Sequence, residues 1–140
     1  MAQGEVAINL PFSTDSLGIF TKSPLDIYPP LAYHLNMIFI ETSIFTKEIQ
    51  RLIPDDEYKN LQQDLMLRPT AGSLIKGSGG LRKIRWKVPT EGKRGGVRII
   101  YYWDPPDTIY MLLPYKKSEQ DDLTFAQLKT LRKLVKECLS

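Results

Sequence analysis

The sequence contains one cysteine and one histidine in 140 residues, and its apolar runs are short. A single cysteine, Cys138, excludes an intramolecular disulfide framework, so a reducing cytoplasm is the expected compartment. No run approaches the roughly 20 apolar residues that span a bilayer. The first residues carry no basic group ahead of an apolar segment, as a secretory signal would. We therefore expect a cytoplasmic protein without membrane contact.

The scarcity of histidine removes several catalytic classes. His34 lies outside the domain delimited below, so that domain holds no histidine acid/base pair, Ser-His-Asp triad or Cys-His pair. Acidic clusters at 55–57 and 121–122 lie at expected helix starts, where capping and the helix dipole explain them better than a metal site does. The glycines at 77–80 precede a strand, and Gly92-Lys93 lacks the Ser or Thr of a P-loop. We expect neither a metal nor a cofactor, and Cys138 is expected to be inert.

The chain divides into an extension and a basic domain. Residues 1–36 contain four prolines and show no helical or strand period. Their formal charge is −2, and because the whole chain carries +3, the remainder carries +5. We interpret 1–36 as an extension, flexible or due to an upstream start, and 37–140 as the domain. In the alternative, the extension packs its apolar residues on the domain through Leu10, Phe12, Phe20 and Tyr33.

The domain pattern predicts an α+β fold in the order strand, helix, helix, strand, strand, strand, helix. Thr42 or Ser43 is expected to cap the first helix, which ends at Pro54, and Asp55 to cap the second, which ends at Arg68. Strand-like runs follow at 81–88, 97–103 and 109–113, and a capping-box pattern at 124–127 starts the last helix. The short connections predict a small antiparallel sheet packed against the helices.

The richest chemical signal lies in the run at 81–88. Its alternation puts Ile84, Trp86 and Val88 on one face and Lys83, Arg85 and Lys87 on the other. Seven of the 17 residues from Arg82 to Arg98 are basic, and only Glu91 opposes them. A solvated face of an edge strand is the plain structural explanation.

Neighbouring strands strengthen the case for a nucleic-acid ligand. Arg98 and Tyr102 share a face of the next strand, and the third strand ends in Tyr115-Lys116-Lys117. Arginine and lysine bind phosphates, and bases stack on aromatic rings, so single-stranded RNA is favoured over duplex DNA. The expected RNA-binding residues are Arg82, Lys87, Lys93, Arg94, Tyr102, Tyr115 and Lys116.

Cations alone can also support phosphoryl chemistry. An RNA 2′-hydroxyl attacks its own 3′-phosphate if a protein aligns the attack, moves protons and stabilises the phosphorane. Lysine crowded by other cations can transfer protons near neutral pH, whereas arginine stays charged and suits a phosphate clamp. Such a site requires no metal.

Three strings in this order resemble the HigB branch of the RelE toxin superfamily: LRKIR at 81–85, GKRGGVRIIYY at 92–102 and YKKSEQDDL at 115–123. They follow the acidic helix segment PDDEYKNLQQDLMLRP, and the resemblance covers about residues 37–135. It implies a small toxin of a type II toxin–antitoxin pair, an mRNA interferase that enters the ribosomal A site and cleaves translated mRNA without a metal ion. The partners it implies are the ribosome, mRNA and a cognate antitoxin, a small helix-turn-helix protein.

The resemblance also implies roles for individual residues. It places Lys83 and Arg85 on the strand of proton transfer and phosphate binding, Arg98 in a phosphate clamp, and Lys117 after the last strand. RelE carries a tyrosine shortly after that strand where this chain has Leu123, and Tyr115 or Tyr102 is the candidate replacement.

Two other functions fit the same basic sheet. One is a non-catalytic RNA- or ribosome-binding module. The other is a structural partner protein whose basic face docks an acidic, antitoxin-like surface. Toxicity on expression and cleavage of ribosome-bound mRNA discriminate among the three.

Overall fold

The computed structural model describes residues 37–88 and 96–139. The predictions for the extension, for His34 and for Lys93 and Arg94 lie outside these residues. The elements, in chain order, are β2 (Ile38–Glu41), α2 (Ser43–Leu52), α3 (Asp55–Leu67), β3 (Ser73–Leu74), β4 (Arg82–Trp86), β5 (Val97–Asp104), β6 (Thr108–Lys116) and α4 (Phe125–Leu139). None of the described helices is both long and apolar enough to cross a membrane.

The α+β class is confirmed, with five strands in the order β2-β6-β5-β4-β3. β4, β5 and β6 form the predicted antiparallel meander. The prediction of a purely antiparallel sheet is wrong, because β2 pairs with β6 in parallel. The two helices and three strands between β2 and β6 provide the long crossover that a parallel pair needs. The sequence pattern does not predict β3, since two residues are too short to show an alternation.

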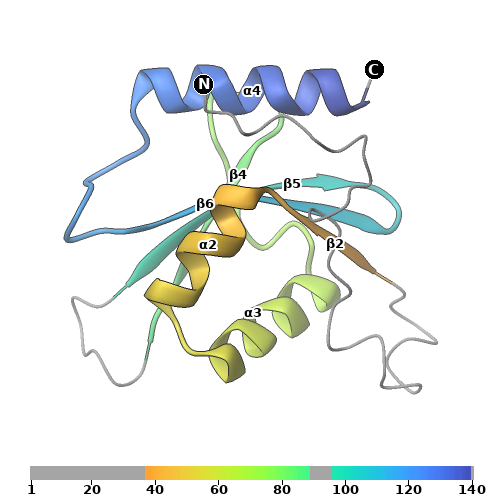
Figure 1. The fold of residues 1–140 in the computed structure, drawn as a ribbon. Coiled ribbons are helices and arrows are strands. Elements are labelled where there is room, and N and C mark those ends of the chain that lie inside the picture. The colour runs from red at the N-terminus through yellow and green to blue at the C-terminus, as the bar shows by residue number, and fades with distance from the viewer. Residues whose placement is uncertain (1–36, 89–95, 140) are drawn as a thin grey trace.

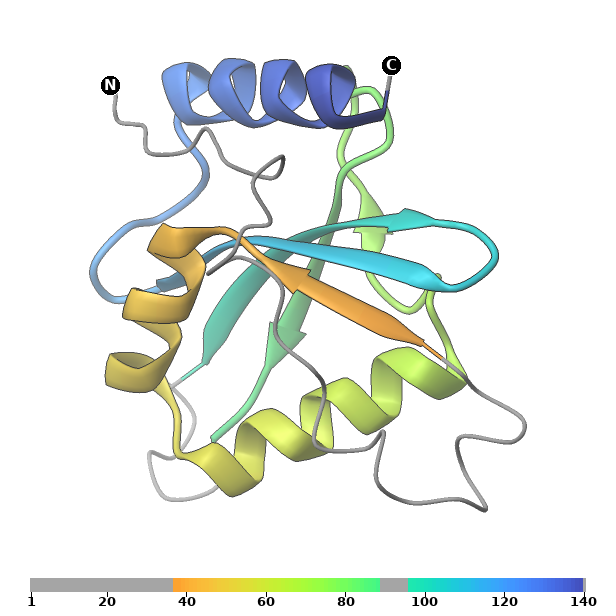
Figure 2. The same cartoon turned by 45° about the vertical axis from the view of Figure 1, so that its right-hand side comes forward.

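The sheet lies between two helical layers. Figure 1 shows α4 along one face, and α2 and α3 on the opposite side; Figure 2 shows the crossing of the strands between them. The larger apolar cluster joins α2 and α3 to the sheet through residues such as Phe45, Leu61 and Ile99. The smaller one joins α4 to the other face through residues such as Leu131 and Ile100. Both faces of the sheet are therefore partly covered.

Local sequence explains how α2 and α3 begin. Thr42 caps α2 as expected, because its Oγ1 accepts a hydrogen bond of 3.0 Å from the Phe45 amide. The N-cap of α3 is Pro54 and not the predicted Asp55, which lies in the first turn with two further acids. Proline, with its fixed φ, starts the helix without a side-chain cap, and the acids still favour the positive end of the helix dipole.

The last helix follows its sequence signature closely. The Thr124 Oγ1 accepts from the Gln127 amide, and the Gln127 side chain accepts from the Thr124 amide, both at 3.0 Å. This is the predicted capping box. Leu131 and Val135 are buried against the sheet, and Leu128 packs beside them. The predicted apolar stripe therefore fixes which side of α4 faces the sheet.

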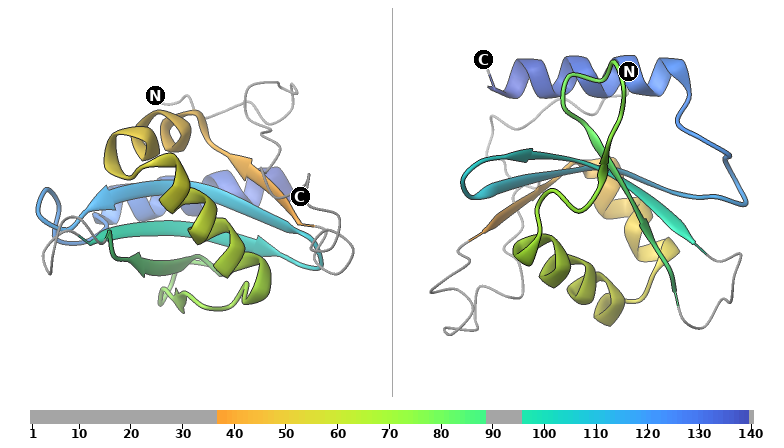
Figure 3. Two further views of the ribbon diagram at one scale, coloured as in Figure 1. Left: turned by 90° about the horizontal axis from the view of Figure 1, so that it is seen from below. Right: turned by 180° about the vertical axis from the view of Figure 1, so that it is seen from behind.

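The alternation along β4 is confirmed. Val88 is buried in the α2–α3 cluster, and Ile84 and Trp86 pack against it while Arg85 and Lys87 remain exposed. Ile84 and Trp86 are only half-buried, because β3 pairs with Arg82 and Lys83 alone. Beyond that point the described residues place no strand on the outer edge of β4, which Figure 3 shows from behind. A cavity lies along this open stretch.

Candidate anion-binding site

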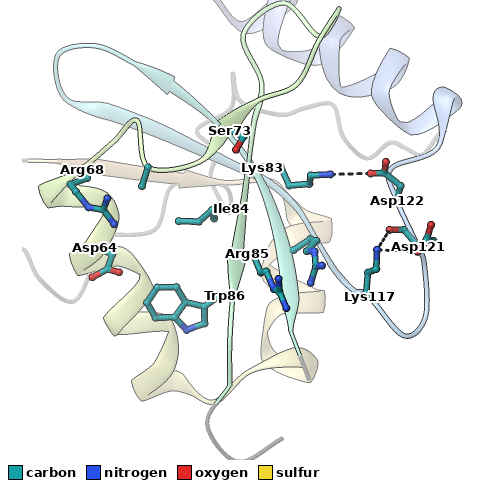
Figure 4. Close-up of a pocket in the computed structure, with 12 residues that line it drawn as sticks. Asp64, Arg68, Ser73, Lys83, Ile84, Arg85, Trp86, Lys117, Asp121 and Asp122 are labelled. Atoms are coloured by element: carbon teal, nitrogen blue, oxygen red, sulfur yellow. Dashed lines mark hydrogen bonds and ion pairs between the residues drawn. The ribbon is translucent and has the colours of Figure 1, made fainter. Parts of the chain in front are cut away.

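A cavity of about 520 Å³ lies along the open part of β4. It brings together the four residues that the resemblance marks as catalytic, which are Lys83, Arg85, Arg98 and Lys117. Figure 4 shows Lys83 and Arg85 on one side of β4, facing the loop with Lys117, and Ile84 and Trp86 on the other side. These four residues come from β4, β5 and the segment after β6, so distant parts of the chain contribute to one cavity.

Two arginines lie directly opposite each other at the centre of the site. Arg85 on β4 and Arg98 on β5 are register partners, so their side chains share the face of the sheet that α4 partly covers. Among the described residues, neither guanidinium has a hydrogen-bond or ion-pair partner. Like charges directly opposite on neighbouring strands are destabilising. Arg85 and Arg98 therefore form a site to which an anion can bind.

Gly96, the residue before β5, lies close to both arginines. A Cβ built at Gly96 would lie 3.0 Å from Arg98 Nη1 and 3.7 Å from Arg85 Nε. A side chain there would require the end of the flexible Arg98 side chain to shift slightly, whereas the contact with Arg85 would be an ordinary one. The glycine therefore leaves room for the Arg98 guanidinium.

The two lysines of the cavity are neutralised by adjacent acids. Lys83 Nζ lies 3.2 Å from Asp122 Oδ1, and Lys117 Nζ lies 3.0 Å from Asp121 Oδ1. Both acids belong to the loop between β6 and α4. Within the described part of the chain, the site therefore contains two guanidinium groups without a partner, flanked by two ion-paired ammonium groups.

Tyr115 extends the row of Arg85 and Arg98 across the sheet, since it is the register partner of Arg98 on β6. Its ring is buried, and its hydroxyl lies 3.3 Å from Asp122 Oδ1. Burial, followed by the nearby Asp122 carboxylate, raises the pKa of Tyr115 to about 12. The pKa of Asp122 is lowered, first by the Leu123 backbone N–H and then by Lys83.

The other side of the cavity has a different character. Ile84 and Trp86 supply apolar surface there, and Asp64 of α3 and Arg68, which follows α3, supply charge. The Trp86 indole N–H donates to Glu57 Oε1 at 3.0 Å, which fixes the ring against the first turn of α3. The cavity therefore offers a flat apolar group beside its cationic half.

Several predicted RNA-binding residues lie elsewhere. Arg82 Nη1 donates to the carbonyls of Thr70 and Gly72 at 3.2 and 2.7 Å, so it holds the chain before β3. Tyr102 packs in the α4 cluster, with its ring 6.4 Å from that of Tyr110. Lys87 is exposed just past β4, and Lys116 is the last residue of β6; neither lines the cavity.

Asp121 and Asp122 are the site residues that sequence reasoning misses. The sequence explains them as acids just before the helix that Thr124 caps, and α4 does begin at Phe125 with Thr124 as its cap. Their side chains instead reach the cavity lysines. The one signal in the sequence is the i,i+4 spacing of Lys117 and Asp121; the contact of Asp122 with Lys83 spans 39 residues and has no local signature.

The arrangement suits a phosphodiester. The guanidinium groups of Arg85 and Arg98 can donate to phosphate oxygens in bidentate fashion, and the ammonium groups can add charge at its flanks. Within residues 37–88 and 96–139, no group of three or more His, Cys, Asp and Glu side chains is placed to hold a metal ion. No protein-family model matches the chain.

Proposed function

We propose that this protein is the toxin of a type II toxin–antitoxin pair, a HigB-like member of the RelE superfamily with its sheet topology. It acts as a ribosome-dependent, metal-independent endoribonuclease that cleaves translated mRNA and so inhibits translation. A small helix-turn-helix antitoxin neutralises it. The observation that carries the proposal is the pair of opposed guanidinium groups of Arg85 and Arg98, unpartnered among the described residues, in a cavity that also holds two lysines.

The proposed reaction uses these groups directly. The 2′-hydroxyl of the nucleotide before the scissile bond loses its proton to solvent water and attacks phosphorus. The bond to the 5′-oxygen breaks, and a 2′,3′-cyclic phosphate and a 5′-hydroxyl form. Arg85 and Arg98 stabilise the charge that develops on the non-bridging oxygens. The 5′-oxygen takes a proton as it leaves, and Lys83 and Lys117 are the ammonium groups within the cavity that can supply it.

Arg98→Ala tests the proposal. If Arg98 binds the scissile phosphate mainly in the transition state, cleavage of mRNA on programmed ribosomes should fall by about two to four orders of magnitude. Ribosome affinity, measured separately, should change much less because other cations still meet ribosomal phosphates. Arg132→Ala is the matched control, since Arg132 is exposed on α4 and does not line the cavity.

Three further alanine variants assign the roles. Lys83→Ala and Arg85→Ala should behave like Arg98→Ala. Lys87→Ala should mainly weaken binding and reduce its salt dependence. If binding and cleavage fell equally in all four variants, the protein would still be a nuclease, but the catalytic roles given to Lys83, Arg85 and Arg98 would be wrong.

The second candidate is a non-catalytic RNA- or ribosome-binding module. It is favoured by the ion pairs of both cavity lysines, which leave only the phosphate-binding arginines unneutralised at the centre of the described cavity. Wild-type protein that binds ribosomes but leaves every message uncut would establish this candidate over the nuclease.

A further inference from the structure

Three hydrogen-bond donors meet at one oxygen of Asp122. Its Oδ1 accepts from the Leu123 amide at 2.7 Å, from Lys83 Nζ at 3.2 Å and from the Tyr115 hydroxyl at 3.3 Å. The Leu123 amide is part of the backbone, and the Tyr115 ring is 5% exposed and packed beneath α4. Two of the three donors are therefore fixed by the fold. They hold the carboxylate in place independently of the lysine.

Lys83 depends on this carboxylate for its own position. Its side chain is 35% exposed, and a lysine ammonium on four methylenes populates many rotamers unless something selects one. The other charged groups that line this half of the cavity are Arg85, Arg98 and Lys117, which repel it, and Asp121, which pairs with Lys117. Asp122 is the acid that orients Lys83.

We propose that Asp122 is a positioning residue for RNA cleavage. It holds the Lys83 ammonium beside the Arg85–Arg98 pair, and the Tyr115 hydroxyl and the Leu123 amide anchor it there. Lys83 is consequently held where it can meet the scissile phosphodiester as a charge partner of the two arginines. This inference rests on the proposed function, in which Lys83 acts at the phosphate.

Asp121 provides the natural comparison. It carries the same charge one residue earlier, but its side chain is 91% exposed, against 66% for Asp122, and it pairs with Lys117 only four residues away in the same loop. Exposed pairs of this kind contribute little. Asp121 also contributes least to the raised pKa of Tyr115, whereas Asp122 contributes most after burial of the ring.

The experiment compares Asp122→Asn, Asp121→Asn and Asp107→Asn in the full chain. The asparagine oxygen at 122 can still accept from Leu123, so the change removes charge while keeping the turn. Single-turnover cleavage on programmed ribosomes, ribosome affinity and a spectroscopic titration of Tyr115 are measured for each. Asp107 lies in the turn between β5 and β6, accepts from Thr108 and does not line the cavity.

Asp122→Asn should slow cleavage by about 10- to 100-fold, the scale of a misplaced reacting group. Its ribosome affinity should stay within about threefold, since phosphate contacts by the arginines remain. It should also lower the pKa of Tyr115 from about 12, though not to its ordinary value because burial remains. Asp121→Asn should change the rate far less, and Asp107→Asn should change neither property.

Two results separate this inference from the proposed function. Cleavage slowed equally in Asp122→Asn and Asp121→Asn would overturn the positioning role and leave the nuclease intact. Wild-type protein without cleavage would overturn the nuclease and the positioning role together. Should Asp122→Asn fail to fold, Tyr115→Phe keeps the packed ring and removes one anchor; an unchanged rate in that variant would overturn the inference.

Discussion

Replacing Arg98 by methionine should stabilise the protein at low salt while it abolishes the proposed activity. Methionine keeps much of the aliphatic stem and removes the charge that faces Arg85 across the β4–β5 pair. Two unit charges about 6 Å apart in water repel by about 0.7 kcal/mol, within the range of roughly 0.2–1 kcal/mol for cross-strand pairs. Because the flanking lysines are neutralised by Asp121 and Asp122, this pair dominates the local repulsion.

A gain of about 0.5–1 kcal/mol corresponds to a rise in Tm of roughly 2–6 °C for a chain of this size. Thermal unfolding in about 20 mM salt should show it. In about 0.5 M salt, where the screening length falls to roughly 4 Å, the difference should largely vanish. The wild type alone should also gain stability from added phosphate, because the anion binds only the folded site.

Arg82→Met is the matched variant with the opposite sign. It removes the same charge from the neighbouring strand β4, but Arg82 donates to the carbonyls of Thr70 and Gly72. Leaving these unsatisfied should cost about 1–2 kcal/mol at any salt concentration. An Arg98→Met protein that is less stable than wild type at low salt, or whose gain in stability persists at high salt, would refute the inference that Arg85 and Arg98 repel each other and so favour a bound anion.

Two further predictions concern the stability of the fold around the site. Gly72→Ala should lower the free energy of unfolding, measured in urea, by about 1–3 kcal/mol, because the new Cβ would lie 2.8 Å from the Tyr101 ring. Gly77→Ala should lower it by about 1 kcal/mol, because Gly77 has open space around it but a φ of +72°, which alanine rarely adopts. Burial and the nearby Glu41 raise the pKa of Tyr58 in the folded protein. Above the pKa of an unfolded tyrosine, near 10, the unfolded chain loses this proton while the folded protein keeps it, so the stability that Tyr58 contributes decreases as the pH rises. Tyr58→Phe should therefore reduce the loss of stability per pH unit above pH 10 by about 1.4 kcal/mol, and an unchanged slope would contradict this.

Sequence patterns suffice where the determining interactions are local. Thr42 and Thr124 are caps that act within three residues, and both follow from residue type and spacing. The alternation in β4 likewise sorts Lys83 and Arg85 to one face because successive side chains of a strand always point to opposite sides. These local rules are enough to place the cations of β4 on a common surface.

The features that sequence patterns miss depend on pairings between distant segments. The parallel contact of β2 with β6 joins Ile38 to Thr108, and no residue type in either strand specifies its direction. Strand β6 also continues past its expected end through Pro114 to Lys116. Proline is tolerated there because β2 covers only residues 108–111, so that Pro114 needs no partner on that side.

The loop between β6 and α4 shows why the site is harder to predict than the sheet that carries it. The acidic side chains of this loop contact three different elements. Glu119 forms an ion pair with Arg51 of α2 at 3.0 Å, and Asp122 accepts hydrogen bonds from Lys83 of β4 and Tyr115 of β6. Each contact is exposed or half-exposed, so the loop adds little to the stability of the core. It nevertheless decides where the lysine charge lies relative to the arginines. Residues that matter for such a site contribute through geometry that no local pattern encodes, and variants in this loop should therefore alter activity before they alter folding.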